Sequence, residues 1–207
     1  RVRLRFSLQV RCNRTVREMS GFQDVLTSRR TIYRFSEKKV GAEALELAFD
    51  AARNAPCHKN THPWKFYVMG DEVRKEIIPE VKRLAKKKVP DGENSEVGIS
   101  KAVDKILSPP VLICVTSALS PQDAFREEED YAATVCATHN LVLSLWGNGI
   151  GSQWSTGAIT RSEASYGAIG ASSDEERIIG FIKIGYPSGV VPSKNKKGLE
   201  EIREYIP

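Results

Sequence analysis

The chain has 207 residues, of which 41% are hydrophobic and 28% are charged, and its formal net charge is +5. This composition is that of a globular protein, and the length predicts one domain with a sizeable core. No run of about 18 to 20 apolar residues occurs, which argues against a helix that spans a membrane.

The four cysteines lie far apart in the sequence, at positions 12, 57, 114 and 136, and no C-x-x-C pair occurs. That spacing excludes a zinc knuckle and a redox dithiol. Cys114 and Cys136 lie within apolar runs, as buried free thiols do. We therefore expect a reducing compartment, in the simplest case the cytoplasm.

Residues 1–19 form a basic extension, in which six arginines precede the first acidic residue, Glu18. Such a beginning is compatible with a transit peptide, with a basic arm for an acidic partner, or with a natural start at Met19. A transit peptide would direct the protein to a mitochondrion or plastid. We exclude the extension from the fold and expect residues 20–207 to form the domain.

The first predicted elements come from apolar periodicity. A helix is predicted over 21–29, and a clearer one over 41–54 should end before Pro56, because the residue before a proline avoids the helical region. Alternating aromatic and apolar residues predict a strand over 64–69.

The middle of the chain is more polar. The basic segment 71–89 predicts a helix that is kinked or restarted at Pro79. Residues 90–100, rich in Gly, Asp, Asn and Ser, predict a loop. A short apolar strand is predicted over 111–115.

The last third contains the most apolar helix, predicted over 130–148. Strands are predicted over 150–155 and 178–184 with a helix over 160–169 between them, and a short helix over 198–206 closes the chain. Because the elements lack a strict βαβ rhythm, we predict an α+β fold.

The loop at 55–64, Ala-Pro-Cys-His-Lys-Asn-Thr-His-Pro-Trp, is dense in reactive side chains. Cys57, His58 and His62 are possible metal ligands, but a structural zinc site needs four, and only scattered candidates remain elsewhere. Cys57 with His62 or His139 as base would make a nucleophile, although no orienting residue is implied by the spacing. Cys57 packing as a small hydrophobe is the simpler alternative. We predict neither a metal site nor an acid–base triad.

Glycines and basic clusters also invite interpretation. Gly-Asn-Gly-Ile-Gly at 147–151 follows a predicted helix and opens a strand, the reverse of a dinucleotide-binding fingerprint. These glycines should instead end the helix and let the backbone approach something flat. The run at 86–88 is interpreted as a solvated face. The clusters at 28–35 and 194–197 lie at element boundaries, where two cations could hold a phosphate.

Together, four segments resemble motifs of the nitroreductase family of flavin oxidoreductases, over nearly all of residues 20–207. Arg-Arg-Ser followed by a basic residue and an aromatic is similar to Arg-Arg-Thr-Ile-Tyr-Arg-Phe at 29–35. Ala-Pro-Ser-x-x-Asn-x-Gln-Pro-Trp is similar to 55–64, and Gly-Leu-Gly-Ser-x-Trp to Gly-Ile-Gly-Ser-Gln-Trp at 149–154. Gly-Tyr-Pro, a basic pair and Leu-Glu-Glu resemble parts of 185–201. One motif alone is a weak signal, but four in order are a strong one.

The resemblance implies an FMN-binding homodimer with active sites at the subunit interface, and a central mixed, mostly antiparallel sheet flanked by helices. It implies that residues 29–31 and two lysines meet the FMN phosphate and ribityl chain. Residues 155–157 would place backbone against the isoalloxazine edge, and the 55–64 loop would line the flavin of the partner subunit. The implied cofactor-binding residues are Arg29, Arg30, Thr31, Tyr33, Pro56, Cys57, His58, Asn60, Ser155, Thr156, Gly157, Lys194 and Lys196.

Three positions depart from the family pattern. Cys57 stands where the family has serine and His62 where it has glutamine, and Tyr33 stands where a basic residue is usual, with Arg34 one place later. A missing cation would raise the cost of a reduced, anionic flavin. We expect these changes to affect the electron acceptor and the redox potential more than flavin binding.

The leading hypothesis is therefore an FMN-dependent oxidoreductase that takes hydride from NADH or NADPH and passes electrons to a nitroaromatic, a quinone or a similar flat acceptor by a ping-pong mechanism. Cations and backbone donors near the flavin would stabilise its reduced form. The alternative is a flavin-binding or sensing protein without efficient turnover. A third possibility, binding of nucleic acid or a membrane through the basic extension, predicts salt-sensitive binding that is lost without residues 1–18. We expect neither as a partner.

Overall fold

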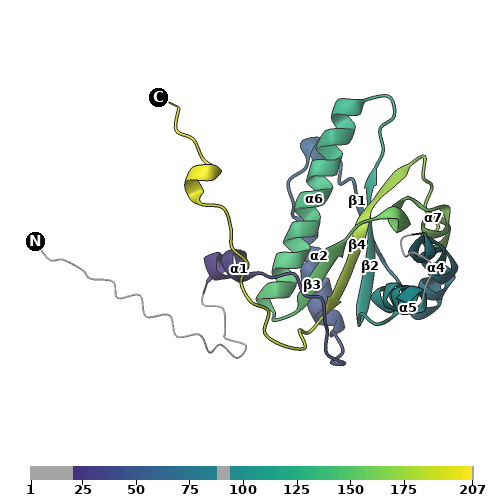
Figure 1. Ribbon diagram of the computed structural model, residues 1–207. Coiled ribbons are helices and arrows are strands. Elements are labelled where there is room, and N and C mark those ends of the chain that lie inside the picture. Colours follow the sequence, from purple (N-terminus) through teal and green to yellow (C-terminus); the bar gives the residue numbers. More distant parts are fainter. Residues whose placement is uncertain (1–20, 88–93, 207) are drawn as a thin grey trace, which may run out of the picture.

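The computed structural model describes residues 21–87 and 94–206. The basic extension with Cys12, and part of the loop predicted at 90–100, lie outside the described residues. Four strands form one sheet with the order β1-β2-β4-β3, and all three pairings are antiparallel (Figure 1). The strands are β1 (Trp64–Val68), β2 (Val111–Ala118), β3 (Gly151–Ser155) and β4 (Glu176–Gly185). One parallel bridge joins Thr31 to Ser152. The predicted α+β class with a mostly antiparallel sheet is confirmed.

Helices cover both faces of the sheet (Figure 1). One face carries α2 (Ala42–Arg53) and α6 (Ala124–Gly147), and the other carries α3 (Asp71–Glu76), α4 (Ile78–Lys86), α5 (Asn94–Leu107) and α7 (Glu163–Ile169). The remaining elements are α1 (Phe22–Ser28) and the short 3-10 helices η1 (His58–Asn60), η2 (Ala158–Arg161) and η3 (Leu199–Glu201).

The two central strands are apolar on both sides, which is why helices pack on both faces. Along β2, Ile113 and Val115 pack in the cluster with α2 and α6, whereas Leu112 and Cys114 pack in the cluster with α3 to α5 and α7. Successive strand residues point to opposite faces. Burial raises the pKa of the Cys114 thiol to about 12, so this cysteine stays protonated. Cys136, expected to be buried, is exposed on α6.

Several predicted boundaries need correction. The helix predicted over 71–89 is split between α3 and α4, with Pro79 in the first turn of α4, as expected. The loop prediction over 90–100 is wrong from Asn94 onward, because α5 begins there. Helix α6 starts at Ala124, where the Asp123 side chain caps it by accepting from the Arg126 N–H at 3.0 Å.

The strand predicted over 111–115 continues to Ala118. Its polar residues Thr116 and Ser117 are buried, because each has a polar partner. The hydroxyl of Thr116 donates to Glu176 Oε2 at 2.5 Å, and Thr134 donates to Ser117 Oγ at 3.1 Å. A hydrogen-bonded hydroxyl is tolerated inside a protein.

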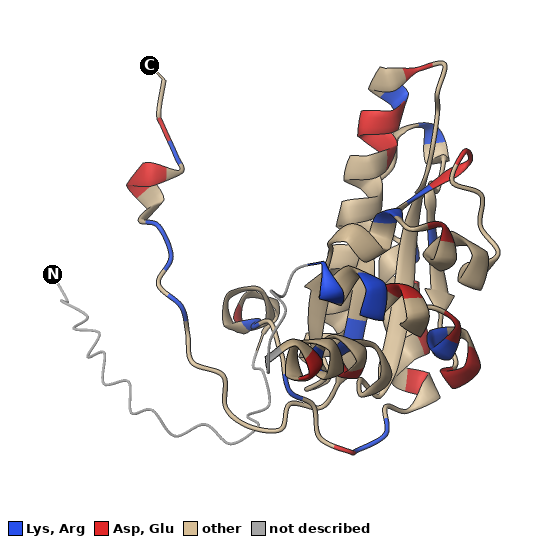
Figure 2. Cartoon of the chain, turned by 45° about the vertical axis from the view of Figure 1, so that its right-hand side comes forward, with Lys and Arg blue, Asp and Glu red and all other residues tan. Residues whose placement is uncertain are grey.

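The helix predicted over 198–206 is wrong, because only the 3-10 turn η3 forms there. The chain leaves the body after β4 and runs as an extended arm that carries both basic and acidic residues (Figures 1 and 2). Ile202 is 68% exposed and Ile206 is 87% exposed, so no packing stabilises a longer helix. Within the described residues, no helix has the length and apolar character needed to cross a membrane.

Candidate functional site

The segment that carries the first motif is fastened to the edge strand β3. The Ile32 N–H donates to the Ser152 carbonyl at 2.9 Å, and Thr31 forms its bridge to the same residue. The buried Ile32 side chain fills the space over Gly151, where an added Cβ would lie 2.3 Å from Ile32 Cγ1. The close approach expected at this glycine is therefore made by the chain itself and not by a flat ligand.

The same segment also meets the end of β4. The Ser36 N–H donates to the Tyr186 carbonyl at 2.8 Å, and the Ser188 N–H donates to the Arg34 carbonyl at 3.2 Å. Three of the four motif segments, which are far apart in sequence, therefore lie together along one edge of the sheet.

At the end of β3, residues 155–157 form a turn with unusual backbone. Gly157 has φ 140° and ψ −171°, a conformation that in practice only glycine adopts, and no atom lies within 4 Å of its Cβ position. Its carbonyl accepts from the N–H and the hydroxyl of Thr160 at 3.0 and 2.8 Å. In the part of the chain that the structure describes, the N–H groups of Thr156 and Gly157 donate to nothing. Two adjacent backbone donors thus remain available to a ligand.

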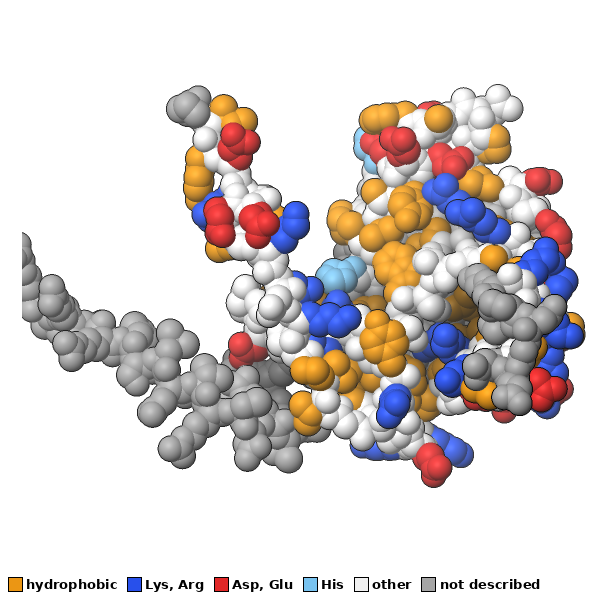
Figure 3. All heavy atoms as spheres, viewed as in Figure 1, with side chains coloured by type: hydrophobic (Ala, Val, Ile, Leu, Met, Phe, Trp, Pro, Cys, Tyr) orange, Lys and Arg blue, Asp and Glu red, His pale blue; other side chains and the backbone are white. Residues whose placement is uncertain are grey.

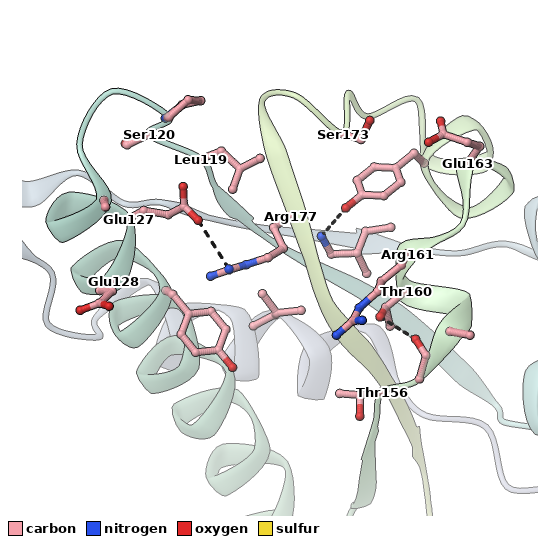
Figure 4. A pocket seen from close by; sticks show the side chains of 18 residues that line it. Leu119, Ser120, Glu127, Glu128, Thr156, Thr160, Arg161, Glu163, Ser173 and Arg177 are labelled. Carbon is pink, nitrogen blue, oxygen red and sulfur yellow. Dashed lines mark hydrogen bonds and ion pairs between the residues drawn. The ribbon is translucent and has the colours of Figure 1, made fainter.

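Two cavities border this turn. The larger, of about 1350 Å³, extends from Thr156 and Gly157 to the start of α6 and the start of β4 (Figure 4). Within it, the Arg177 guanidinium lies 4.7 Å from the centre of the Tyr131 ring and pairs with Glu127 at 3.5 Å. The buried Arg177 Nε has no hydrogen-bond partner among the described residues. This cavity offers an aromatic wall beside the turn, as a flat ligand requires.

The second cavity, of about 420 Å³, lies between α4, α5 and the end of β3. Its lining includes residues 155–157 together with Lys105 of α5 and Lys183 of β4. Burial and, to a smaller extent, the charge of Lys105 lower the pKa of Lys183 to about 8. Sequence reasoning missed both lysines. The available signal was a single lysine within the apolar strand Ile-Ile-Gly-Phe-Ile-Lys-Ile.

The 55–64 loop lies beside β1, at the opposite edge of the sheet from β3. Lys59, Asn60 and His62 all have left-handed backbone, with φ of 50°, 53° and 45°. Such conformations cost about 1 to 3 kcal/mol each for residues other than glycine and are concentrated at ligand sites. The structure holds the loop in a strained shape, as a binding loop would be.

Side chains of this loop contact one another and α6. Cys57 Sγ lies 3.8 Å from His62 Nδ1, and the His62 ring meets Trp64 edge to face at 5.5 Å. His58 Nδ1 lies 3.9 Å from Glu129 Oε1. Pro56 and Asn60 are exposed. Among the described residues, no three His, Cys, Asp or Glu side chains lie close enough to hold a metal ion.

The predicted phosphate-binding residues are only partly brought together. The Arg30 guanidinium turns back to the carbonyls of Thr27 and Arg29, at 3.1 and 2.9 Å, and so caps α1. Arg29 lies near His139 of α6. Burial is the main cause of the lowered pKa of His139, and the positive charge of Arg29 lowers this pKa further. Tyr33 is exposed beside this segment.

Lys194 and Lys196 lie on the C-terminal arm and are exposed. Neither forms an ion pair within the described residues. The single chain therefore assembles the β3 edge and leaves these two lysines and the 55–64 loop apart from it.

Comparison with known proteins identifies the family. The family model described as "Nitroreductase family" matches residues 26–186, which include the β3 edge, both cavities and the 55–64 loop. The chain belongs to the nitroreductase family. The family membership that the motifs predicted is thereby confirmed. The match covers the first three motif segments and the start of the fourth, and it includes the predicted site residues from Arg29 to Gly157 but not Lys194 or Lys196.

Related nitroreductases share the whole length of the domain. One relative is YfhC of Bacillus subtilis, which has been provisionally named an NAD(P)H nitroreductase. It is 27% identical to this chain over 187 residues, which make up 90% of this chain and 94% of YfhC. The crystal structure of a nitroreductase-like protein from Bacillus cereus superposes with a TM-score of 0.76 at 27% identity, covering 93% of this chain and 99% of that one.

A more distant neighbour from Desulfovibrio desulfuricans was solved in complex with FMN. It superposes with a TM-score of 0.68 at 20% identity and covers 90% of this chain and 96% of that one. At this identity the likeness shows that the two proteins share the nitroreductase fold.

Proposed function

We propose that the protein is an FMN-dependent oxidoreductase that takes hydride from NADH or NADPH and passes electrons to a flat acceptor by a ping-pong mechanism. One observation carries the proposal. Residues 29–31 and 155–157 are attached to the two ends of the same edge strand, β3. The three residue steps from Ser152 to Ser155 span about 10 Å of extended chain. Residues 29–31 carry positive charge, and residues 155–157 carry backbone N–H donors. Two such sites at this separation suit a ligand that has a phosphate at one end and a flat ring at the other.

The residues present fit FMN. The open space over Gly157 lets a flat ring lie against the backbone, and the N–H groups of Thr156 and Gly157 suit its polar edge. Arg29 and Thr31 supply a guanidinium and a hydroxyl at the other end, as phosphate oxygens require. When bound, FMN supplies the capacity to accept a hydride and to release its electrons to a second substrate.

The chain's own contribution is binding, orientation and electrostatics. The Gly157 carbonyl is fixed by Thr160, which holds the turn so that its two N–H groups keep their positions. Tyr131 and Arg177 line the larger cavity together with the turn, so a ligand that extends from the turn into this cavity could contact them. No proton-transferring triad is needed for such chemistry, so specificity should come from cavity shape and charge.

We propose a homodimer, and the placement of the 55–64 loop supports it. The strand order puts this loop at the β1 edge, on the far side of β2 and β4 from the β3 edge. We therefore propose that Pro56, Cys57, His58 and Asn60 line the flavin of a second copy. Exposed hydrophobic side chains support such an interface (Figure 3). They include Phe22 and Phe125, each 72% exposed, and Ile206 of the arm, 87% exposed.

We further propose that Lys194 and Lys196 reach the FMN phosphate when the arm docks in the dimer. The Cys57 and His62 side chains, 3.8 Å apart, replace the serine and glutamine of the family pattern. They would therefore present a thiol and an imidazole to the acceptor and influence which acceptor is used.

The test begins with the purified full chain. We expect bound FMN to give a yellow protein, and FMN added to the apoprotein to raise its melting temperature. Arg29→Ala should weaken FMN binding about tenfold or more, because a charge-assisted contact to phosphate is lost. The matched control is Arg53→Ala, since Arg53 is an exposed arginine of α2 that pairs only with Asp50 among the described residues. A colourless protein with no response to FMN would overturn the proposal.

Stopped-flow absorbance tests turnover separately. Mixing the FMN-loaded protein with NADH or NADPH should bleach the flavin, and a quinone or nitroaromatic should restore its colour with rates that fit a ping-pong scheme. Flavin that binds tightly but is not bleached by either nucleotide would instead identify a flavin-binding or sensing protein.

A further inference from the structure

Arg177, near the start of β4, reaches from the sheet toward α6. Its strand neighbour Ile179 packs in the cluster with α2 and α6, and both residues line the cavity of about 1350 Å³. Figure 4 shows Arg177 pointing toward Glu127 of α6. The Arg177 side chain is 43% exposed, so a ligand that enters this cavity can reach it.

Two residues of α6 hold the Arg177 guanidinium in place. Glu127 Oε1 lies 3.5 Å from Arg177 Nη1, and the guanidinium lies over the Tyr131 ring, 4.7 Å from its centre. Glu127 and Tyr131 are four residues apart, so they lie on the same face of the helix. The ion pair and the cation–π contact together orient the guanidinium before a ligand binds.

The side-on edge of this guanidinium, formed by Nε and Nη2, carries donors without a partner. Arg177 Nε is buried and, among the side chains that the structure describes, is the only buried nitrogen or oxygen atom that forms no hydrogen bond. Nη2 also has no partner among the described residues, and the contact with Glu127 uses Nη1. A buried donor without a partner is unfavourable, so we expect a ligand to supply the acceptor. Two parallel N–H groups match the two oxygens of a carboxylate.

The other charged groups of the cavity leave this edge available to an anion. Glu128 and Glu163 also line the cavity, but both are exposed, and water and salt screen exposed charges. In Figure 4, Glu128 points away from Arg177, and Glu163 lies on the opposite side of the cavity from Glu127. The exposed Arg161 of η2 adds a second positive charge and forms no ion pair within the described residues. Glu127 is therefore the main competitor of a ligand for Arg177.

We propose that Arg177 binds the carboxylate of the electron acceptor, and that the site prefers flat aromatic carboxylates. This inference rests on the proposed function and names its class of acceptor. Arg177 is four residue steps, or about 13 Å of strand, from Phe181, which pairs with Ser155 of the turn. The apolar Ile179 lines the cavity between them. A ring that extends from the turn over Ile179 can therefore present its carboxylate to Arg177.

The kinetic test compares para-nitrobenzoate with para-nitrobenzamide, which share the ring and the reducible nitro group and differ in charge. In the wild type, kcat/KM should favour the carboxylate by about tenfold or more, because the analogue leaves the Arg177 donors unpaired. In Arg177→Gln the ratio should fall to about one, with kcat/KM for the amide little changed. The matched control is Arg83→Gln, since Arg83 of α4 also pairs with a glutamate, Glu80, and does not line the cavity. This change should leave the ratio as in the wild type.

Calorimetry with benzoate, which carries no reducible group, measures binding without turnover. Arg177→Gln should weaken benzoate binding about tenfold or more, because charge-assisted hydrogen bonds are lost. Arg177→Lys should fall between Arg177→Gln and the wild type, since an ammonium keeps the charge but lacks the fork of donors. Glu127→Gln should strengthen binding, because glutamine keeps an oxygen for Nη1 and removes the competing charge. Melting temperatures establish that each variant is folded.

The outcomes are distinct. If the wild type reduces both compounds and Arg177→Gln keeps its ratio of kcat/KM values, the role of Arg177 is wrong although the proposed function stands. If Arg177→Gln slows only the bleaching of the flavin by NADH or NADPH, Arg177 contacts the nicotinamide nucleotide and the inference is also overturned. If the wild type binds no FMN, the proposed function itself fails. Benzoate binding that is equal in the wild type and Arg177→Gln would refute the carboxylate contact in either case.

Discussion

The hydroxyl of Thr61 donates to Asp130 Oδ1 at 2.7 Å, and this contact joins the strained 55–64 loop to the middle of the sequence. Asp130 is 2% exposed, and its other oxygen accepts from Arg126 Nε at 2.8 Å. One buried carboxylate of α6 therefore fixes a loop that local sequence preferences do not favour. A loop that is ordered before the ligand binds loses less conformational entropy on binding, so the ligand binds more tightly.

Replacing Asp130 tests this tether. Asp130→Ala should lower the free energy of unfolding by about 2 kcal/mol, because a charged hydrogen-bond acceptor is removed from two donors. FMN affinity should fall as well, since the loop is proposed to line the partner's flavin. Denaturant titration and FMN titration provide the measurements. Asp50→Ala, on an exposed aspartate of α2, should change neither by more than about 0.5 kcal/mol. Equal behaviour of the two variants would contradict the role of Asp130.

Gly157→Ala tests the turn after β3. At φ 140° a side chain is strained whatever the space, so we expect a loss of about 1 to 3 kcal/mol in stability and a marked loss of FMN affinity. The matched control is Gly167→Ala, in the interior of α7 and also free of neighbours within 4 Å. That change should stabilise the protein by about 0.5 to 1 kcal/mol, because alanine is the better helix former. Undiminished FMN binding by Gly157→Ala would argue against this turn as the flavin contact.

Glu176 predicts an acid-sensitive contribution to stability. Burial alone would raise the pKa of its carboxyl, but hydrogen bonds from Lys65, Thr116 and Tyr67 outweigh burial, and the pKa lies below the ordinary 4.5. At pH values between the lowered pKa of the folded chain and the ordinary 4.5 of the unfolded chain, the unfolded chain binds more protons than the folded chain. The free energy of unfolding therefore falls as the pH falls. Glu176→Gln should cost about 2 kcal/mol at pH 7. In denaturant titrations, the difference in free energy of unfolding between Glu176→Gln and the wild type should become smaller below about pH 4.5. A difference that is constant from pH 7 to pH 3 would refute the lowered pKa of Glu176.

Lys183 predicts that stability also rises with pH in the alkaline range. Its pKa falls from 10.5 in the unfolded chain to about 8 in the fold, because of burial and then of Lys105. Between these pH values the unfolded chain binds more protons, so the wild type gains stability as the pH rises. The full penalty, present below about pH 8, is at most about 3 kcal/mol. Relative to Lys183→Met, the FMN-free wild type should therefore recover stability between pH 7 and pH 10. A difference independent of pH would show that Lys183 keeps its ordinary pKa.

Much of the chain could be interpreted without a structure. The helix over 41–54, its end before Pro56 and the strands at 64–69 and 178–184 follow from periodicity and from the steric effect of proline. The family membership, confirmed by the match to residues 26–186, was visible in four short motifs. The failures are also local. Residues 94–100 and 116–118 look polar in sequence but are helical and extended. Thr116 and Ser117 are accommodated in β2 because side chains from elsewhere in the fold form hydrogen bonds with them.

What the sequence determined by itself is which segments bury one face and which motifs are present, because periodicity and short motifs are properties of neighbouring residues. The strand order β1-β2-β4-β3 was decided only by the tertiary structure. That order brings residues 29–31, 155–157 and 186–188 to one edge and leaves the 55–64 loop at the other. It also places Lys183 beside Lys105 and Thr61 beside Asp130. Such pairs depend on long-range packing, and no spacing along the chain encodes the distance between them.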